Sequence, residues 1–198
     1  MLIREAQNGD HGIVIATPTK TGTEMLGKML TKDDQFQYIL AKHRITYPDA
    51  PGQRRILPVR DPYRRLQSMY TWAIKHGGAR GQNFATKHCR DAFGGEWCDF
   101  STFLRFHSTI THQTWGQSYS AIARVFNPSE IWWLEQIEDH LREFATGSWK
   151  RDDKGALIIA KTNTSKMNKR NIEFSAEDLA VVRPFVVEDC MRYGYDVR

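Results

Sequence analysis

The stretch that decides the fold is Gly12-Ile13-Val14-Ile15-Ala16-Thr17-Pro18-Thr19-Lys20-Thr21-Gly22-Thr23-Glu24-Met25-Leu26. A short apolar run ends at a Thr-rich loop that holds Lys20 and Gly22, and an apolar pattern at helical spacing begins at Met25. This order predicts a buried strand, a tight loop and a helix. Such a loop directs backbone N–H groups and the amino end of a helix at one point, which favours a bound anion. Lys20 adds a positive charge there, and the hydroxyls of Thr21 and Thr23 add donors.

The loop differs from the Walker A sequence, in which the lysine directly follows the last glycine. Here Lys20 comes before Gly22, and no glycine opens the loop. The pattern therefore disfavours an ordinary ATP or GTP site. A strand-to-helix turn that contains glycine and binds nothing is the structural alternative.

A second motif has the same strand-to-helix arrangement. The apolar run Ile56-Leu57-Pro58-Val59 is followed by Arg60-Asp61-Pro62-Tyr63-Arg64-Arg65-Leu66-Gln67-Ser68. Asp61 suits a helix N-cap and Pro62 the first helical position, so Arg60 ends a strand and Ser68 lies about two turns into a helix. The apolar stripe of this helix is predicted to be Leu66, Met69, Tyr70 and Ala73, and Gly77 is predicted to end it.

Together the two motifs resemble those of the sulfotransferases that use 3′-phosphoadenosine-5′-phosphosulfate (PAPS) as donor. The first is similar to their phosphosulfate loop, Pro-Lys-(Ser/Thr)-Gly-Thr-(Thr/Ser), and the second to Arg-(Asp/Asn)-Pro-x-x-Arg-x-x-Ser, which binds the 3′-phosphate. The resemblance implies that Arg60 and Ser68 hold the 3′-phosphate. It also implies that the phosphosulfate is held by Thr19, Lys20, Thr21, Gly22, Thr23 and Glu24. Glu24 departs from the family pattern, which has a hydroxyl residue at that position.

The C-terminal third adds to this resemblance. Residues 131–135 are predicted to form a strand, followed by a helix with the apolar face Ile137, Leu141 and Phe144. A capping-box pattern at Ser175 begins a last helix, which Pro184 should bend. Its predicted buried face is Leu179, Val182, Val186, Cys190 and Tyr193. The ending at residues 189–196 is similar to that of many carbohydrate-type sulfotransferases, and Lys166 lies near the point where related enzymes close a loop over the nucleotide.

The predicted fold is a single α/β domain over residues 1–198, with a mainly parallel sheet flanked by helices, similar to the P-loop-like sulfotransferase fold. Ligands of such sheets lie at the carboxyl ends of the strands, where Lys20 and Arg60 are expected. Pro58 lacks a ladder donor, so a bulge or a local edge is expected there. A further strand is expected over residues 156–160.

Sulfuryl transfer needs a group that takes the proton of the acceptor hydroxyl, which favours a histidine or a shifted glutamate. Residues 36–43 are predicted to form the second strand, which ends at His43. The family places its base, His or Glu, at about this point, so Lys20 and His43 are the predicted catalytic residues. His112, in a predicted loop, is the rival base.

Net charge, apolar content and cysteine number limit the kinds of partner and compartment that we expect. The net charge is +5 and the isoelectric point near 9.2, which suits an anionic nucleotide or an acidic glycan, and a nucleic-acid partner is not expected. No apolar run approaches the length of a membrane span, and no secretory leader is visible. The three cysteines are predicted to be free thiols in a reducing, cytoplasmic compartment. His88, Cys89 and Cys98 match no zinc pattern, so no metal is expected.

The sequence therefore predicts a PAPS-dependent sulfotransferase that leaves 3′-phosphoadenosine-5′-phosphate (PAP) as product and modifies a hydroxyl acceptor, expected to be a carbohydrate. One alternative is a P-loop-like nucleotide kinase, which would need ATP and Mg²⁺. Another is a non-catalytic protein of the same fold that binds PAP or another polyanion.

Overall fold

The structure is a computed structural model that describes residues 1–4, 12–31, 36, 46, 48, 51–80, 99–109, 116–145, 149–158 and 172–198. Within these ranges the chain is α/β, with one four-stranded sheet and six α-helices. The chain divides into two compact units. The sheet unit is Met1–Arg60 with Ala123–Ser165, and the helical unit is Asp61–Ile122 with Lys166–Arg198. The prediction of one domain over the whole chain stays a prediction.

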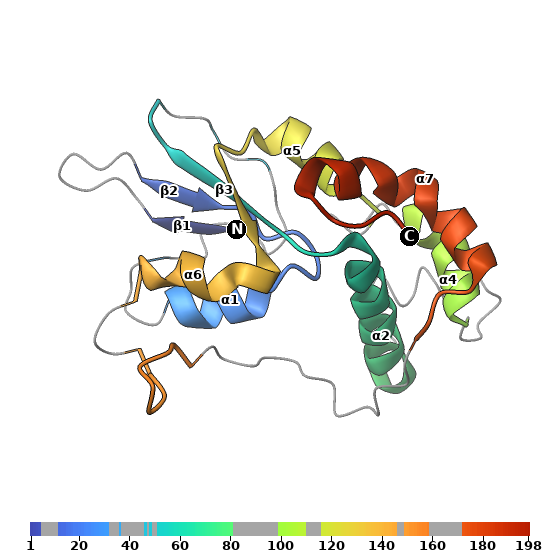
Figure 1. Cartoon of the computed structure of the whole chain (residues 1–198), viewed down its shortest axis with the longest axis horizontal. Coiled ribbons are helices and arrows are strands. Elements are labelled where there is room, and N and C mark those ends of the chain that lie inside the picture. Colours follow the sequence, from blue (N-terminus) through green and yellow to red (C-terminus); the bar gives the residue numbers. More distant parts are fainter. Residues whose placement is uncertain are drawn as a thin grey trace. The chain divides into compact units, whose positions relative to one another are not determined.

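The sheet has the strand order β1-β2-β3-β4 (Figure 1). Its strands are β1 (Leu2–Arg4), β2 (Ile13–Ile15), β3 (Arg54–Val59) and β4 (Glu130–Trp133). The ladders of β2 with β3 and of β3 with β4 are parallel, which confirms the predicted mainly parallel sheet. The edge strand β1 pairs antiparallel with β2, with Leu2 opposite Ile15, and the sequence analysis did not anticipate this strand.

The strand β2 is buried on both faces. Ile13, Val14 and Ile15 are fully buried, as β-branched residues in a covered sheet are expected to be. Two helices, α1 (Thr23–Leu30) and α6 (Ile137–Arg142), contribute apolar side chains to one core with the strands. The buried members of this core are Leu2, Ile13, Ile15, Leu26, Met29, Leu30, Phe36, Ile56, Trp132, Ile137, Leu141, Phe144, Trp149 and Leu157.

Pro58 lies at a local edge, as predicted. The pairing of β2 with β3 ends at Ile15 opposite Ile56. The carbonyl of Ile56 accepts from the N–H of Ala16 at 2.9 Å, so Ile56 faces β2, and by alternation Pro58 faces the same side. The N–H that Pro58 lacks would therefore point to where β2 has already ended. Toward β4 the register continues through Pro58 opposite Trp132, and these two described strands show no bulge.

Two predicted strands differ from the structure. Leu134 and Glu135 were expected to continue β4, but they form the short 3₁₀ helix η2 (Leu134–Gln136), which leads directly into α6. In the described part of the strand expected over residues 156–160, Leu157 makes a single antiparallel bridge to Arg151. A turn held by the Asp152 carboxylate, which accepts from the N–H of Ala156 at 2.9 Å, keeps this pairing local. Of the strand expected over residues 36–43, only Phe36 is described, and it is buried.

The helical unit is built from α2 (Pro62–Arg80), α4 (Phe100–Phe106), the 3₁₀ helix η1 (His107–Thr109) and α7 (Ala176–Tyr193). The unit boundary passes through α5 (Tyr119–Phe126). Aromatic edge contacts, such as Tyr63 with Phe174 at 5.4 Å, are frequent in its core. The buried members of this core are Tyr63, Leu66, Met69, Phe100, Phe103, Leu104, Val182, Val186 and Cys190.

The helix starts follow the predicted capping chemistry. The Asp61 carboxylate accepts from the N–H groups of Tyr63 at 2.8 Å and Arg64 at 3.2 Å, and α2 begins at Pro62. Ser175 and Asp178 form the predicted capping box of α7. The end of α2 was predicted wrongly, because the helix runs through Gly77 to Arg80. A helical glycine is unfavourable by about 1 kcal/mol relative to alanine, which does not by itself end a helix.

The interior of the helical unit holds a bonded carboxylate. The carboxylate oxygens of Asp189, which is 2% exposed, accept from the backbone N–H groups of Tyr119 at 2.7 Å and Ser120 at 2.8 Å. Asp189 on α7 therefore caps the amino end of α5. The guanidinium of Arg65 donates to the Gln117 carbonyl at 2.7 Å and lies 4.6 Å from the centre of the Tyr119 ring.

Candidate functional site

The loop of residues 16–22 joins β2 to α1 in the predicted strand-loop-helix order. Lys20 and Gly22 both have left-handed backbones, with φ of 65° and 74°. The N–H of Thr21 donates to the Pro18 carbonyl at 3.3 Å, which closes a turn around Thr19 and Lys20. A non-glycine residue with this conformation is uncommon and marks Lys20 as a strained position.

The threonine hydroxyls of this loop bond to its own backbone. The Thr21 hydroxyl donates to the Pro18 carbonyl at 2.6 Å, and the Thr23 hydroxyl lies 3.2 Å from the same oxygen and 3.4 Å from the Thr17 carbonyl. Thr19, Thr21 and Thr23 are all buried. A hydroxyl has one proton to donate, so in this conformation Thr21 and Thr23 stabilise the loop. Their role as donors to an anion stays a prediction and requires the hydroxyls to turn.

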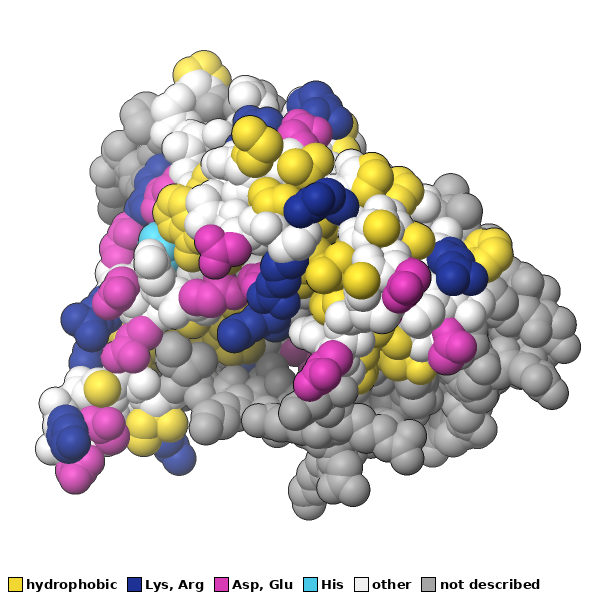
Figure 2. All heavy atoms as spheres, turned by 45° about the vertical axis from the view of Figure 1, so that its right-hand side comes forward, with side chains coloured by type: hydrophobic (Ala, Val, Ile, Leu, Met, Phe, Trp, Pro, Cys, Tyr) yellow, Lys and Arg dark blue, Asp and Glu magenta, His cyan; other side chains and the backbone are white. Residues whose placement is uncertain are grey.

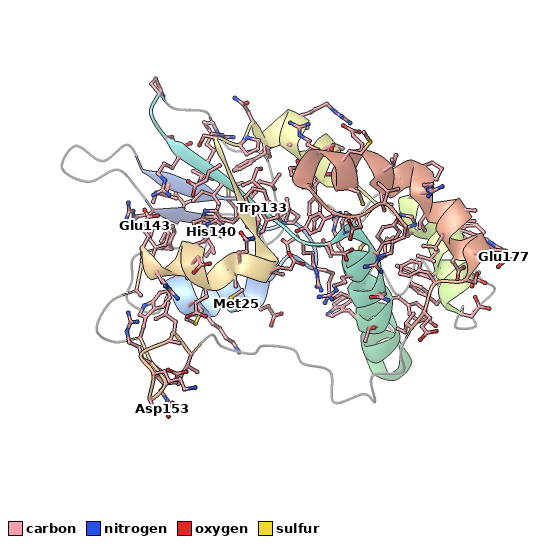
Figure 3. The ribbon with its side chains drawn as sticks, in the orientation of Figure 1. Met25, Trp133, His140, Glu143, Asp153 and Glu177 are labelled. Atoms are coloured by element: carbon pink, nitrogen blue, oxygen red, sulfur yellow. The ribbon has the colours of Figure 1, made fainter. Side chains whose placement is uncertain are left out.

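Gly22 is crowded by Leu134, the first residue after β4. A Cβ built on Gly22 would lie 2.8 Å from Cδ1 of Leu134 and 3.2 Å from Cε of Met25. Figure 3 labels Met25 on α1 and Trp133, the neighbour of Leu134, at the end of β4. Leu134 therefore packs directly on the loop, and a larger residue at position 22 would require its side chain to shift. Leu134 was not among the predicted site residues, because no local sequence pattern shows a contact between residues 112 positions apart.

Charged side chains flank the loop. Lys20 is half-buried, whereas Glu24, in the first turn of α1, is exposed. A carboxylate at this end of a helix interacts favourably with the helix dipole, which accounts for Glu24 without a ligand.

Arg60 follows the end of β3 and meets the same loop. Its Nη1 lies 3.4 Å from the Lys20 carbonyl oxygen, and its buried Nε has no hydrogen-bond partner among the described residues. β2 and β3 are parallel neighbours, so their carboxyl ends share one edge of the sheet. The structure thus brings Arg60 to the backbone of Lys20.

The other predicted site residues are not brought to this place by any described contact. Ser68 lies half-buried on α2 in the helical unit. His43 and His112, the two predicted bases, lie outside the described residues, as does Lys166.

An open hollow lies at the opposite ends of the strands. It is lined by Pro51, Gly52, Gln53, Arg55, Asn127, Pro128 and Ser129. The buried Arg55 donates from Nε and Nη2 to the Phe126 carbonyl, at 2.9 and 2.6 Å, and from Nη1 to the Pro48 carbonyl and the Gln53 side chain. Arg55 therefore acts as a structural link between β3 and the carboxyl end of α5.

Neither metal nor thiol chemistry is indicated for the described part of the chain. No group of three or more His, Cys, Asp or Glu side chains there is placed to hold a metal ion. Burial, with the nearby Asp61 carboxylate as a smaller cause, raises the pKa of the Cys190 thiol to about 11. Cys190 is thus protonated at neutral pH and serves the core.

The charges on the visible face are mixed. Figure 2 shows Lys and Arg side chains interspersed with Asp and Glu and separated by apolar side chains. None of the helices within the described ranges has the length and apolar character that crossing a bilayer requires.

No family model, curated protein or solved structure matches this chain.

Proposed function

We propose that this protein transfers the sulfuryl group of PAPS to a hydroxyl acceptor, with a carbohydrate as the acceptor class. One observation carries the proposal: Arg60, from the second motif, lies against the backbone of Lys20, from the first, at the carboxyl edge of two parallel strands. The resemblance assigns these two motifs to the two phosphate ends of one nucleotide.

The residues fit such a nucleotide in two respects. The buried Nε of Arg60 has no partner among the described residues, and guanidinium groups bind phosphates well because their donors form a planar fork. The loop also leads into the amino end of α1, where backbone N–H groups favour a bound anion. When bound, PAPS supplies an activated sulfuryl group.

The chain's own residues would supply the rest. Lys20 would stabilise the negative charge that develops on the leaving phosphate, while the loop and Arg60 hold the donor in line with the acceptor. His43 would take the proton of the acceptor hydroxyl, with His112 as the rival for this role.

Calorimetry with PAP, ADP and ATP, with and without Mg²⁺, tests the proposal. PAP carries a 3′-phosphate that ADP lacks, and a desolvated Arg–phosphate contact is worth about 2–5 kcal/mol. We expect PAP to bind roughly thirtyfold to several thousandfold more tightly than ADP without Mg²⁺, and Arg60→Ala to erase most of this difference. The matched control is Arg183→Ala, which removes an exposed arginine of α7. Equal affinities for PAP and ADP would refute the proposal, and tight ATP binding that depends on Mg²⁺ would favour the kinase.

Turnover is tested separately, by sulfate transfer from PAPS to a panel of sugars. His43→Ala should abolish transfer while PAP still binds, because a base acts on the acceptor. If His43→Ala stays active and His112→Ala does not, the base is His112. If the wild-type protein binds PAP but no acceptor becomes sulfated, the protein is a binding protein of the same fold.

A further inference from the structure

The segment that follows α7 returns to the start of α2. The backbone N–H of Arg198 donates to the Tyr63 hydroxyl at 3.0 Å, and that hydroxyl donates to the Arg198 main-chain oxygen at 3.3 Å. The Arg198 guanidinium lies over the Tyr63 ring, 4.9 Å from its centre. Tyr63 is fully buried and packs edge-on against Phe174 at 5.4 Å. Arg198 is thus bound to a fixed point of the helical unit.

Arg198 also binds the carboxylate that caps α2. Its Nη2 donates to Oδ2 of Asp61 at 2.8 Å, while Oδ1 of Asp61 accepts from the N–H groups of Tyr63 and Arg64. The Asp61 side chain is 16% exposed and that of Arg198 43% exposed. One carboxylate therefore links the first turn of α2 to the arginine after α7.

The Asp61 carboxylate belongs to the neighbour of a residue that is proposed to bind phosphate. Asp61 directly follows Arg60 in the sequence, and Arg60 is proposed to hold the 3′-phosphate. A negative charge beside a bound dianion raises the free energy of binding unless a cation offsets it. Arg198 supplies such a cation at 2.8 Å from Oδ2 of Asp61, closer than the exposed Arg64, whose Nε lies 4.0 Å from the same oxygen.

We infer that Arg198 is a positioning residue for the 3′-phosphate. It offsets the negative charge of Asp61 and fixes the first turn of α2. This inference rests on the proposed function. Arg198 itself need not touch the nucleotide. Its effect should therefore depend on Asp61.

The test is calorimetry of PAP and ADP binding to a set of variants. Arg198→Ala should weaken PAP binding about twofold to fivefold, the upper range of a partly exposed charge pair, and leave ADP binding nearly unchanged. Arg198→Lys, which keeps the charge, should retain most of the affinity. Asp61→Asn in the Arg198→Ala background should restore PAP binding, because asparagine still caps the helix but has no charge to offset.

The matched control is Arg183→Ala, which removes one positive charge from an exposed position on α7. It should change neither affinity, so that a loss in Arg198→Ala cannot come from net charge alone. Restored binding in the double variant supports charge compensation, which a purely structural role of Arg198 would not give.

The binding measurements distinguish a failure of the proposed function from a failure of the role of Arg198. If the wild-type protein does not prefer PAP over ADP, the proposed function falls. If the wild-type protein prefers PAP and Arg198→Ala binds it equally well, only the role of Arg198 falls. Weak PAP binding in Arg198→Ala that Asp61→Asn does not restore would also overturn the charge-offset role.

Discussion

Arg60 and Arg65 lie close in the sequence but belong to different units and have different surroundings. In the sheet unit, Arg60 is half-buried at a strand end, and its Nη1 reaches the Lys20 carbonyl at the long distance of 3.4 Å. In the helical unit, Arg65 is 5% exposed, donates to the Gln117 carbonyl at 2.7 Å and stacks on Tyr119. The sheet unit leaves hydrogen-bonding capacity at Arg60, whereas the helical unit uses Arg65 in its own packing.

This difference separates two consequences of mutation. A buried group that is well bonded within the protein contributes to stability, and its loss should be measured as a change in the free energy of unfolding. A partly bonded group at a strand end contributes little to stability, and its loss should be measured with a ligand or in turnover.

Lys20→Ala should have the largest effect, and it acts on turnover. Removing one preorganised electrostatic donor typically lowers the rate by about 10²–10³, or roughly 2.7–4 kcal/mol. PAP affinity and thermal stability should change far less, because Lys20 is half-buried and would act on charge that develops during the reaction. Steady-state kinetics checks this, with Lys28→Ala on the exposed side of α1 as control. Near wild-type turnover in Lys20→Ala would remove this residue from the mechanism.

Asp189→Ala should have the largest effect on stability. The change leaves two buried N–H groups at the start of α5 without their acceptor, so the free energy of unfolding should fall by about 3 kcal/mol. Urea denaturation measures the loss, and hydrogen exchange at Tyr119 and Ser120 should locate it. Glu188→Ala, one residue away and exposed, is the control. A loss below about 1 kcal/mol would contradict the view that the helical unit depends on its buried polar groups.

Two glycines with nearly the same backbone allow a comparison between the units. Gly22 and Gly194 have φ of 74° and 75°, but a Cβ at Gly22 would lie 2.8 Å from Leu134, and one at Gly194 would meet nothing within 4 Å. Gly194→Ala should therefore lower the free energy of unfolding by about 1 kcal/mol, the strain of a left-handed alanine. Gly22→Ala should lower it by about 2–3 kcal/mol, because the contact with Leu134 adds to the same strain.

Thermal denaturation of both variants checks this difference, and Leu134→Ala added to Gly22→Ala should recover part of the second loss. Equal losses at the two glycines would show that Leu134 moves aside freely and that the loop is not crowded.

The smallest expected effect is a change of the free energy of unfolding with pH. Burial lowers the pKa of His107 from its ordinary value near 6.5, and the Arg65 charge lowers it further, although a hydrogen bond to the Leu104 carbonyl opposes this. The unfolded chain therefore binds a proton at a pH where folded His107 does not. The stability that neutral His107 contributes is complete above about pH 6.5 and is lost as the pH falls toward its folded pKa.

Denaturation of the wild-type protein and of His107→Asn between pH 7 and pH 5 tests this. The slope due to His107 cannot exceed about 1.4 kcal/mol per pH unit, and it should be missing in the variant, in which asparagine can still donate to Leu104. If the free energy of unfolding has the same slope against pH in both proteins, the pH dependence comes from groups other than His107.

The sequence predicted those parts of the fold that local pattern determines. The strand-loop-helix order around Lys20, the Asp61 cap and the Ser175 capping box each depend on residues within a few positions of one another, and all three are present. The buried face of α7 was also predicted, because helical spacing identifies it: Val182, Val186, Cys190 and Tyr193 are buried, and Leu179 is half-buried.

Contacts between distant residues could not be predicted in this way. The strand β1 is only three residues long, too short for an alternating pattern to appear. The packing of Leu134 on Gly22 and the capping of α5 by Asp189 join segments that are neighbours only after folding. For the site, the sequence identified Lys20 and Arg60 as partners at one sheet edge, but the inward bonding of the threonine hydroxyls depends on the shape of the loop.

The left-handed backbone of Lys20 has a consequence for how this loop can vary. A lysine in this conformation is about 1 kcal/mol less favourable than a residue without a Cβ, so Lys20→Gly would relax the backbone. Glycine would also increase the conformational freedom of the unfolded chain, so its two effects on stability oppose each other. A replacement of Lys20 other than glycine keeps the backbone strain, and its effect can therefore be assigned to the loss of the side chain.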